Sequence, residues 1–212
     1  MTVTSIVPHD IKGRRLKVFL DGAFAFTLYA GEIKKYNIEE GEEIGDEEYI
    51  SITKELLPKR VKQRAMNLLM KRDYTSKQLI KKLTEGGYTE EMANGALHYV
   101  SSYGYVDDER YAHDYCLSRM ERASRRRIET DLERRGISRE VYTPALDRCY
   151  EGADEDHELS MISAILEKKG YRAGEEAPDE RTNIRLMSYL MRRGFTMDNI
   201  RKAMRGDTAY QD

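Results

Sequence analysis

Two short, largely hydrophobic runs near the start of the chain are typical of β-strands. These runs are Arg15–Leu20 and Ala23–Tyr29, and Asp21-Gly22 joins them. An Asp-Gly pair between strand-like runs is a strong hairpin signal, because both turn positions need positive φ. We therefore predict a β-hairpin, which must pair with another strand or pack on the rest, since an isolated hairpin is only marginally stable. Residues 39–48 are acidic with two glycines, and predict a loop that leads into a helix near Asp46.

From Lys59 onward the hydrophobic pattern is helical and repeats itself. Apolar residues recur at one spacing in the first helix of each copy: Ala65, Leu68 and Leu69; then Ala112, Tyr115 and Cys116; then Ile162, Ile165 and Leu166. The second helix of each copy carries an i,i+4 apolar pair on one face: Leu79 and Leu83, Ile128 and Leu132, Leu186 and Leu190. The third helix has a small residue followed by a large one: Ala96-Leu97, Ala145-Leu146 and Ala203-Met204. The pattern predicts three copies of a three-helix unit.

The end of each second helix has its own signature. A glycine follows the second apolar residue of the pair by four positions, at Gly87, Gly136 and Gly194. Glycine there predicts a left-handed helix end. One large apolar residue comes next, and then a hydroxyl residue that suits the N-cap of the third helix, at Thr89, Ser138 and Thr196.

These elements together predict the fold class and the domain organisation. We expect a mainly α protein of three tandem three-helix repeats in an elongated array, preceded by a small N-terminal β-hairpin module. The predicted boundaries are 1–57 for the hairpin module and 58–106, 107–153 and 154–212 for the repeats. The period is about 47–50 residues between the first two copies, and an insertion over residues 170–179 lengthens the third. Repeat arrays of this kind present a long surface to a partner.

Charge is nearly balanced overall and strongly segregated along the chain. The net charge is −2, yet residues 59–82 carry nine Lys and Arg against one acidic residue, Asp73. Such a block attracts a polyanion or an acidic protein surface. No run of about 18 apolar residues exists, which excludes a transmembrane helix. With two cysteines and no signal peptide, we expect a cytoplasmic protein with no membrane partner.

Catalytic and cofactor signatures are absent from the sequence. It has neither of the glycine-rich loops that bind nucleotide phosphates. His113 and Cys116 lie one helical turn apart, but two ligands fall short of a zinc site and Cys116 occupies a repeat core position. Asp107-Asp108 precedes a helix, where acids cap free N–H groups. We expect no enzyme activity, no catalytic residues, no cofactor and no metal.

Basic residues are the candidate binding site. In the first repeat they are Lys59, Arg60, Lys62, Arg64, Lys71, Arg72, Lys77, Lys81 and Lys82. In the second they are Arg119, Arg122, Arg125, Arg126, Arg127, Arg134 and Arg135. The second set is interspersed with acids that can satisfy much of it through i,i+3 and i,i+4 pairs. Even so, Arg125-Arg126-Arg127 opens a helix, where cations oppose the dipole, so local stability does not explain them.

These motifs resemble those of the bacterial RecX family. Residues 105–112, with the sequence YVDDERYA, are similar to its signature, and residues 65–83 to its first-repeat motif. The resemblance covers about residues 60–205, and the hairpin is similar to the extension of longer members. One departure is Ala123-Ser124, where a glycine is common in the family. The resemblance implies a non-enzymatic regulator that binds the RecA filament on single-stranded DNA, in DNA repair, recombination and the SOS response, and mainly inhibits its ATPase and strand exchange.

The sequence leaves two other interpretations open. Three-helix units also occur in helix-turn-helix transcription regulators, although the third helices here are not uniformly basic. A scaffold for an acidic protein, without a nucleic-acid role, is the other alternative. Direct DNA binding in addition to RecA contact is also possible. DNA binding weakens steeply as the salt concentration rises, whereas apolar protein–protein contact weakens much less, so a salt titration separates these interpretations. We expect a monomer.

Overall fold

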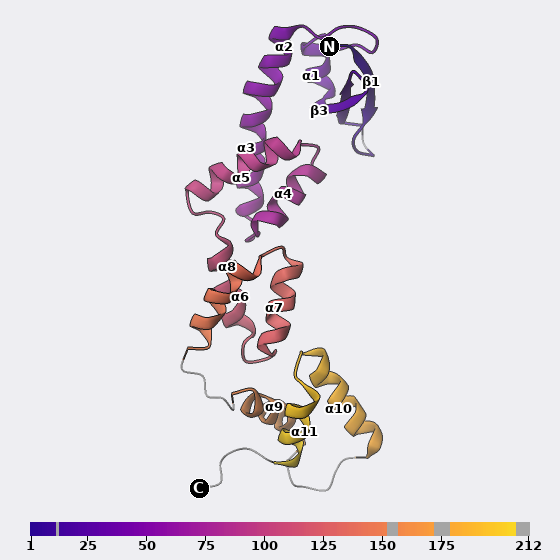
Figure 1. Ribbon diagram of the computed structural model, residues 1–212. Coiled ribbons are helices and arrows are strands. Elements are labelled where there is room, and N and C mark those ends of the chain that lie inside the picture. Colours follow the sequence, from indigo (N-terminus) through magenta and orange to yellow (C-terminus); the bar gives the residue numbers. More distant parts are fainter. Residues whose placement is uncertain (12, 152–156, 172–178, 207–212) are drawn as a thin grey trace. The chain divides into compact units, whose positions relative to one another are not determined.

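The computed structural model describes residues 1–11, 13–151, 157–171 and 179–206 (Figure 1). The chain divides into two compact units, Met1–Asp107 and Asp108–Asp212. We call them the N-terminal unit and the C-terminal unit. Among the described residues, every helix is too short or too polar to cross a lipid bilayer.

The N-terminal unit begins with an antiparallel sheet of order β1-β2-β3. The strands are β1 (Val3–Pro8), β2 (Arg15–Leu20) and β3 (Ala23–Tyr29). Asp21 and Gly22 have φ of 48° and 82°, so the predicted hairpin turn is confirmed. The expected pairing with another strand is met by β1, which the sequence analysis did not identify. Only Val3 of this edge strand is buried, and its hydrophobic signal is correspondingly weak.

Helical structure starts before Asp46, where the sequence pattern placed the first helix. A short helix α1 (Ala30–Lys35) follows the sheet, and α2 (Asp46–Ile50) confirms the helix expected near Asp46. A six-residue π-helix, η1 (Ser51–Leu56), then joins α2 directly to α3 (Leu57–Leu69). The core of this part is apolar and draws on the sheet, the loop and the helices: Val3, Val18, Leu20, Phe26, Leu28, Ile38, Ile44, Ile52 and Leu57.

The predicted repeats are confirmed as nine helices within the described ranges. Repeat 1 consists of α3, α4 (Ser76–Glu85) and α5 (Glu90–Ser102). Repeat 2 consists of α6 (Asp108–Arg119), α7 (Arg125–Arg134) and α8 (Arg139–Cys149). Repeat 3 consists of α9 (His157–Lys168), α10 (Glu180–Arg192) and α11 (Met197–Arg205). Most of the predicted insertion, residues 172–178, lies outside the described residues.

Each repeat buries most of the apolar positions that the sequence pattern selected. Leu79 and Leu83, Ile128 and Leu132, and Leu190 are 0–1% exposed, whereas Leu186 is partly buried. Three separate core clusters result, one for each repeat. A unit that buries its own apolar face in this way is typical of a repeat architecture. The elongated array stays a prediction.

The turn between the second and third helices is alike in all three repeats. Gly87, Gly136 and Gly194 have φ of 88°, 87° and 90°, which confirms the left-handed ends. The predicted hydroxyl residues occupy the N-caps of the third helices. Thr89 accepts from the Met92 amide at 3.3 Å and Thr196 from the Asn199 amide at 3.2 Å, whereas Ser138 makes no side-chain cap bond.

Candidate functional site

Repeats 2 and 3 are joined within the C-terminal unit by a close backbone contact. The amide of Ser124, the N-cap residue of α7, donates to the carbonyl of Arg193 at 3.0 Å. A Cβ on the adjacent Gly194 would lie 2.4 Å from Ser124 Oγ, a distance that real Cβ atoms essentially never show. The α10–α11 turn therefore lies directly against the start of α7. Ser124, at the departure from the family pattern, is the residue that caps α7 here.

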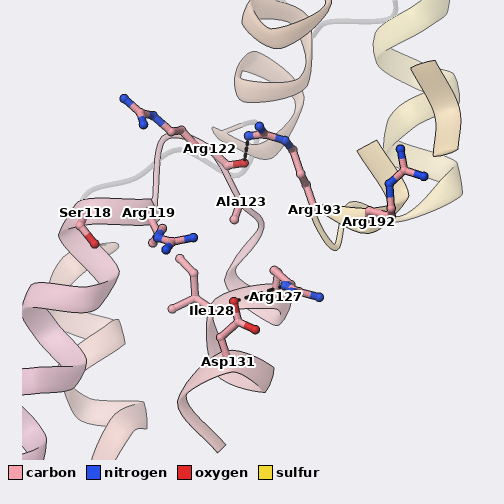
Figure 2. A pocket seen from close by; sticks show the side chains of 9 residues that line it. All are labelled: Ser118, Arg119, Arg122, Ala123, Arg127, Ile128, Asp131, Arg192 and Arg193. Atoms are coloured by element: carbon pink, nitrogen blue, oxygen red, sulfur yellow. Dashed lines mark hydrogen bonds and ion pairs between the residues drawn. The ribbon is translucent and has the colours of Figure 1, made fainter. Parts of the chain in front are cut away.

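A surface pocket of about 520 Å³ opens beside this contact (Figure 2). We call it the junction pocket. Among the described residues that line it, five are arginines and one is acidic: Arg119, Arg122, Arg127, Arg192 and Arg193, with Asp131. Its remaining lining residues are Ser118, Ala123 and Ile128. The excess of cations makes this pocket suitable for a polyanionic surface.

Intramolecular contacts hold three of these arginines in place. Arg127 pairs with Asp131 at 3.3 Å, and Arg193 Nη1 donates to the Arg122 carbonyl at 2.5 Å (Figure 2). Arg193 also lies over the Tyr189 ring at 4.5 Å, and Arg119 over the Tyr115 ring at 5.2 Å. An arginine held over an aromatic ring has less conformational freedom to lose when it binds a ligand.

Among the described residues, only Arg127 of the five junction-pocket arginines has an acidic partner, while Arg119 and Arg193 lie over tyrosine rings. Within the described part of the chain, neither Arg122 nor Arg192 has an acidic side chain within 4.0 Å, and both side chains are exposed. Asp131, the one carboxylate of the lining, is already paired with Arg127 and lies 3.9 Å from Arg134. The pocket therefore retains a positive charge for a partner.

The basic residues predicted in repeat 2 lie in different surroundings in the structure: some line the junction pocket and others form ion pairs or ring contacts. Arg119, Arg122 and Arg127 line the junction pocket, whereas Arg125 pairs with Glu129 at 3.1 Å and with Asp147 at 2.6 Å. Arg135 lies over the Tyr115 ring at 4.4 Å. The expected local pairing with acids is seen for Arg125, Arg127 and Arg134, three of the seven arginines, and the carboxylates of Glu129 and Asp147 balance the charge of Arg125 at the start of α7.

Arg192 and Arg193 were absent from the predicted site residues. The repeat alignment contains the signal that could have found them, because Arg192-Arg193-Gly194 corresponds to Arg134-Arg135-Gly136 in the preceding copy. Charge counting in sequence favoured repeats 1 and 2, since only there do basic residues form dense runs. The fold brings the repeat 3 pair to the repeat 2 arginines.

The basic residues predicted in repeat 1 separate into three groups. Lys77, Lys81 and Lys82 are exposed on α4, where Lys82 pairs with Glu85 at 2.7 Å. Two others lie over tyrosine rings, Lys62 over Tyr99 at 4.7 Å and Arg72 over Tyr74 at 4.3 Å.

The remaining basic residues of repeat 1 belong to α3 and the turn after it. Lys59 and Lys71 are exposed, and Arg60 and Arg64 line a second pocket, beside the sheet. The structure therefore places the basic residues predicted in repeat 1 in several different surroundings.

The residues considered for metal or acid–base chemistry lie on α6 or directly before it. Burial, with the nearby Cys149 thiol, raises the pKa of Cys116 to about 12, so this core thiol stays neutral. His113 lies 3.5 Å from the carboxylate of Asp114, its neighbour in sequence. Over the described ranges, no group of three or more His, Cys, Asp or Glu side chains is placed to hold a metal ion. Helix α6 begins at Asp108, directly after Asp107.

Tandem three-helix domains with arginine-lined pockets define an α-helical repeat protein. Three domain families match it in order: the first, second and third three-helix domains of RecX, over residues 62–99, 107–146 and 155–204. The chain belongs to the RecX family of regulatory proteins.

Individual relatives agree with this assignment. The chain is 34% identical over 205 residues to the regulatory protein RecX of Caldanaerobacter subterraneus subsp. tengcongensis, covering 96% of this chain and 98% of that protein. It is 33% identical over 144 residues to that of Halorhodospira halophila, covering 68% of this chain and 85% of that protein.

Solved structures of RecX proteins share the fold. A crystal structure of regulatory protein RecX has a TM-score of 0.59 at 19% identity, covering 98% of this chain and 99% of that one. RecX from Lactobacillus salivarius has a TM-score of 0.56 at 18% identity, covering 71% of this chain and 96% of that one.

Proposed function

We propose that this regulatory protein binds the RecA filament on single-stranded DNA and lowers its ATPase and strand-exchange activity. Membership of the RecX family gives the regulatory role. The junction pocket, with the uncompensated charges of Arg122 and Arg192, carries the contact with a polyanionic filament. The protein acts by binding, without chemistry of its own, as a cytoplasmic monomer.

The chemistry of arginine supports this partner. A guanidinium group presents a planar fork of donors that matches the oxygens of phosphate and carboxylate groups. A nucleoprotein filament offers both, since it displays DNA phosphates and acidic protein side chains. Basic surfaces occur on both units, on α4 in one and at the junction pocket in the other. Contacts on linked units act through a raised effective concentration, so each can be individually weak.

A helix-turn-helix reader is the less well supported function. Recognition helices place their N-terminal residues on base edges. The third helices here have acidic residues in the first turn: Glu90 and Glu91, Glu140, and Asp198. Carboxylates at these positions repel DNA phosphates.

The test is RecA-catalysed ATP hydrolysis on single-stranded DNA with increasing amounts of this protein. We expect the double variant Arg122→Gln/Arg192→Gln to need about tenfold or more protein for the same inhibition, because a charged hydrogen bond contributes about 1.5–3 kcal/mol. The matched control is Arg181→Gln/Arg201→Gln, which removes two exposed arginines of the same unit outside the junction pocket.

The control should inhibit as the unaltered protein does. Equal inhibition by both double variants would remove the junction pocket from the proposal. No effect of the unaltered protein on the ATPase would refute the proposed function itself.

A further inference from the structure

A second arginine-lined pocket lies within the N-terminal unit, between the sheet, α3 and the α4–α5 turn. We call it the sheet pocket. It has a volume of about 270 Å³. The lining residues that matter here are Arg15, Thr27, Arg60, Arg64, Gly87 and Tyr88. They come from β2, β3, α3 and the turn, so separate elements converge on one small polar space.

The three arginines of the sheet pocket are partly held by their neighbours. Arg15 pairs with Asp10 at 3.0 Å and donates to the Gly86 carbonyl at 2.9 Å. Arg60 pairs with Glu32 and lies over a tyrosine ring. Both guanidinium groups are thus positioned before any ligand arrives.

Arg64 provides the surplus charge of this pocket. It is exposed, and the described part of the chain places no acidic side chain within 4.0 Å of it. The three guanidinium groups therefore face only two paired carboxylates, Asp10 and Glu32. One positive charge remains for an anion.

A buried hydroxyl without a partner points to a ligand in the same place. Thr27 is 6% exposed and lines the sheet pocket, and its Oγ1 has no hydrogen-bond partner among the residues that the structure describes. Gly87, with φ of +88°, lies so close that a Cβ there would be 2.6 Å from this oxygen. A buried hydroxyl left unsatisfied costs stability, so an oxygen-bearing ligand would recover what the free protein loses.

Tyr88 adds a neutral donor to this charged lining. Burial raises the pKa of Tyr88 overall, although the charges of Arg60, Arg64 and Arg15 act in the opposite direction. The phenol therefore keeps its proton at neutral pH.

We propose that the sheet pocket binds a phosphate group. Three guanidinium groups and nearby hydroxyls on separate elements suit the several oxygens of a phosphate, whereas a carboxylate offers only two. The phosphate can belong to a nucleic-acid strand, to a nucleotide or to inorganic phosphate. This inference goes beyond the proposed function, because binding to the free protein involves no RecA.

The first experiment uses potassium phosphate, with potassium chloride and potassium acetate at equal ionic strength as controls. Binding is measured from the melting temperature and from the arginine side-chain NMR signals of the full chain. We expect phosphate alone to raise the melting temperature, because a ligand that binds only the folded state stabilises it. Equal shifts with acetate, or no shift with phosphate, would overturn the proposal.

Two variants locate the site, and a third is their control. Arg64→Gln should weaken phosphate binding about tenfold or more, since it removes the uncompensated charge. Thr27→Val keeps the shape but removes the unpartnered hydroxyl, so the free protein should melt no lower while its response to phosphate falls. Arg14→Gln removes a nearby exposed charge outside the pocket and should respond as the unaltered protein does. Unchanged phosphate binding in both pocket variants would overturn the assignment.

Further titrations distinguish the sources of the phosphate. A single-stranded oligonucleotide and a mononucleotide are each titrated into the unaltered protein and Arg64→Gln. If a DNA strand occupies the pocket, the variant loses oligonucleotide affinity and inorganic phosphate competes. If the ligand is a small phosphate compound, the variant loses mononucleotide or phosphate affinity while oligonucleotide binding is unchanged. Either result supports the phosphate site.

Discussion

Single residues at the repeat core positions carry the stability of this fold. Leu132 is 0% exposed and packs in the repeat 2 core, as its spacing from Ile128 predicts. Leu117 lies in the same repeat but is 51% exposed, because its position falls on the outer face of α6. The two leucines are therefore matched in chemistry and opposite in burial.

Leu132→Ala should destabilise the C-terminal unit by about 2–5 kcal/mol, because the substitution leaves a cavity in a core. Leu117→Ala should change the free energy of unfolding by no more than about 0.5 kcal/mol, as surface substitutions usually do. Chemical denaturation followed by circular dichroism measures both. Similar losses in the two variants would contradict the assigned helical register.

At the scale of elements, a glycine turn of one module lies against the module before it in both units. In the C-terminal unit the Gly194 turn contacts Ser124, and in the N-terminal unit the Gly87 turn contacts Thr27. Both contacts leave no room for a Cβ. An arginine-lined pocket lies beside each of them. The close approach that glycine permits thus brings the two modules of each unit into contact and places an arginine-lined pocket beside that contact.

Gly194→Ala should cost more stability than Gly170→Ala, although both glycines have positive φ, 90° and 79°. In both variants the alanine must adopt a left-handed conformation, which lowers the free energy of unfolding by about 1–2 kcal/mol. Only at Gly194 must the new Cβ also displace Ser124, whereas Gly170 has nothing within 4 Å. Thermal unfolding of the two variants gives the difference. Equal melting temperatures would mean that the turn and α7 are not in close contact.

At the scale of the whole molecule, basic surfaces recur on units that are covalently linked. Exposed lysines of α4 belong to the N-terminal unit, and Arg122 and Arg192 of the junction pocket to the C-terminal unit. Arg125 and Arg127 are poor choices for a binding test, because their removal would also break internal ion pairs. The exposed residues Lys77, Lys81, Arg122 and Arg192 make no ion pair within the described ranges, and Lys82 makes only an exposed pair with Glu85, so they test binding with little disturbance of the fold.

Combining Lys77→Gln/Lys81→Gln/Lys82→Gln with Arg122→Gln/Arg192→Gln should weaken inhibition of RecA far more than either set alone. Linked contacts act through effective concentration, so one surviving surface still retains the filament. The loss should be larger at higher salt, because charge contacts are screened. The measurement is RecA ATPase on single-stranded DNA at two salt concentrations, with circular dichroism as the folding control. Full inhibition by the folded combined variant would refute a role for these charges.

The sequence by itself determined the hairpin, the helix near Asp46 and the three repeats in their order, but not β1, α1 or η1. The Asp21-Gly22 turn, the three repeats and the helix-ending glycines are all read correctly, because backbone preference and hydrophobic spacing act over a few residues. Strand β1 escaped detection, since its stability comes from pairing with β2 and not from its own pattern. The family motifs at residues 65–83 and 105–112 could be recognised for a similar reason, because each is one continuous stretch of sequence.

Only the tertiary structure decided which charges are available and where pockets form. Arg15 meets the Gly86 carbonyl and Arg193 meets the Arg122 carbonyl, each across 71 positions of sequence. The local sequence does not indicate that Arg125 forms an ion pair with Asp147. Nor does it indicate that Arg122 and Arg192 have no acidic partner within the described ranges. Ion pairs and pockets depend on distances between separate helices and strands, and packing alone sets those distances.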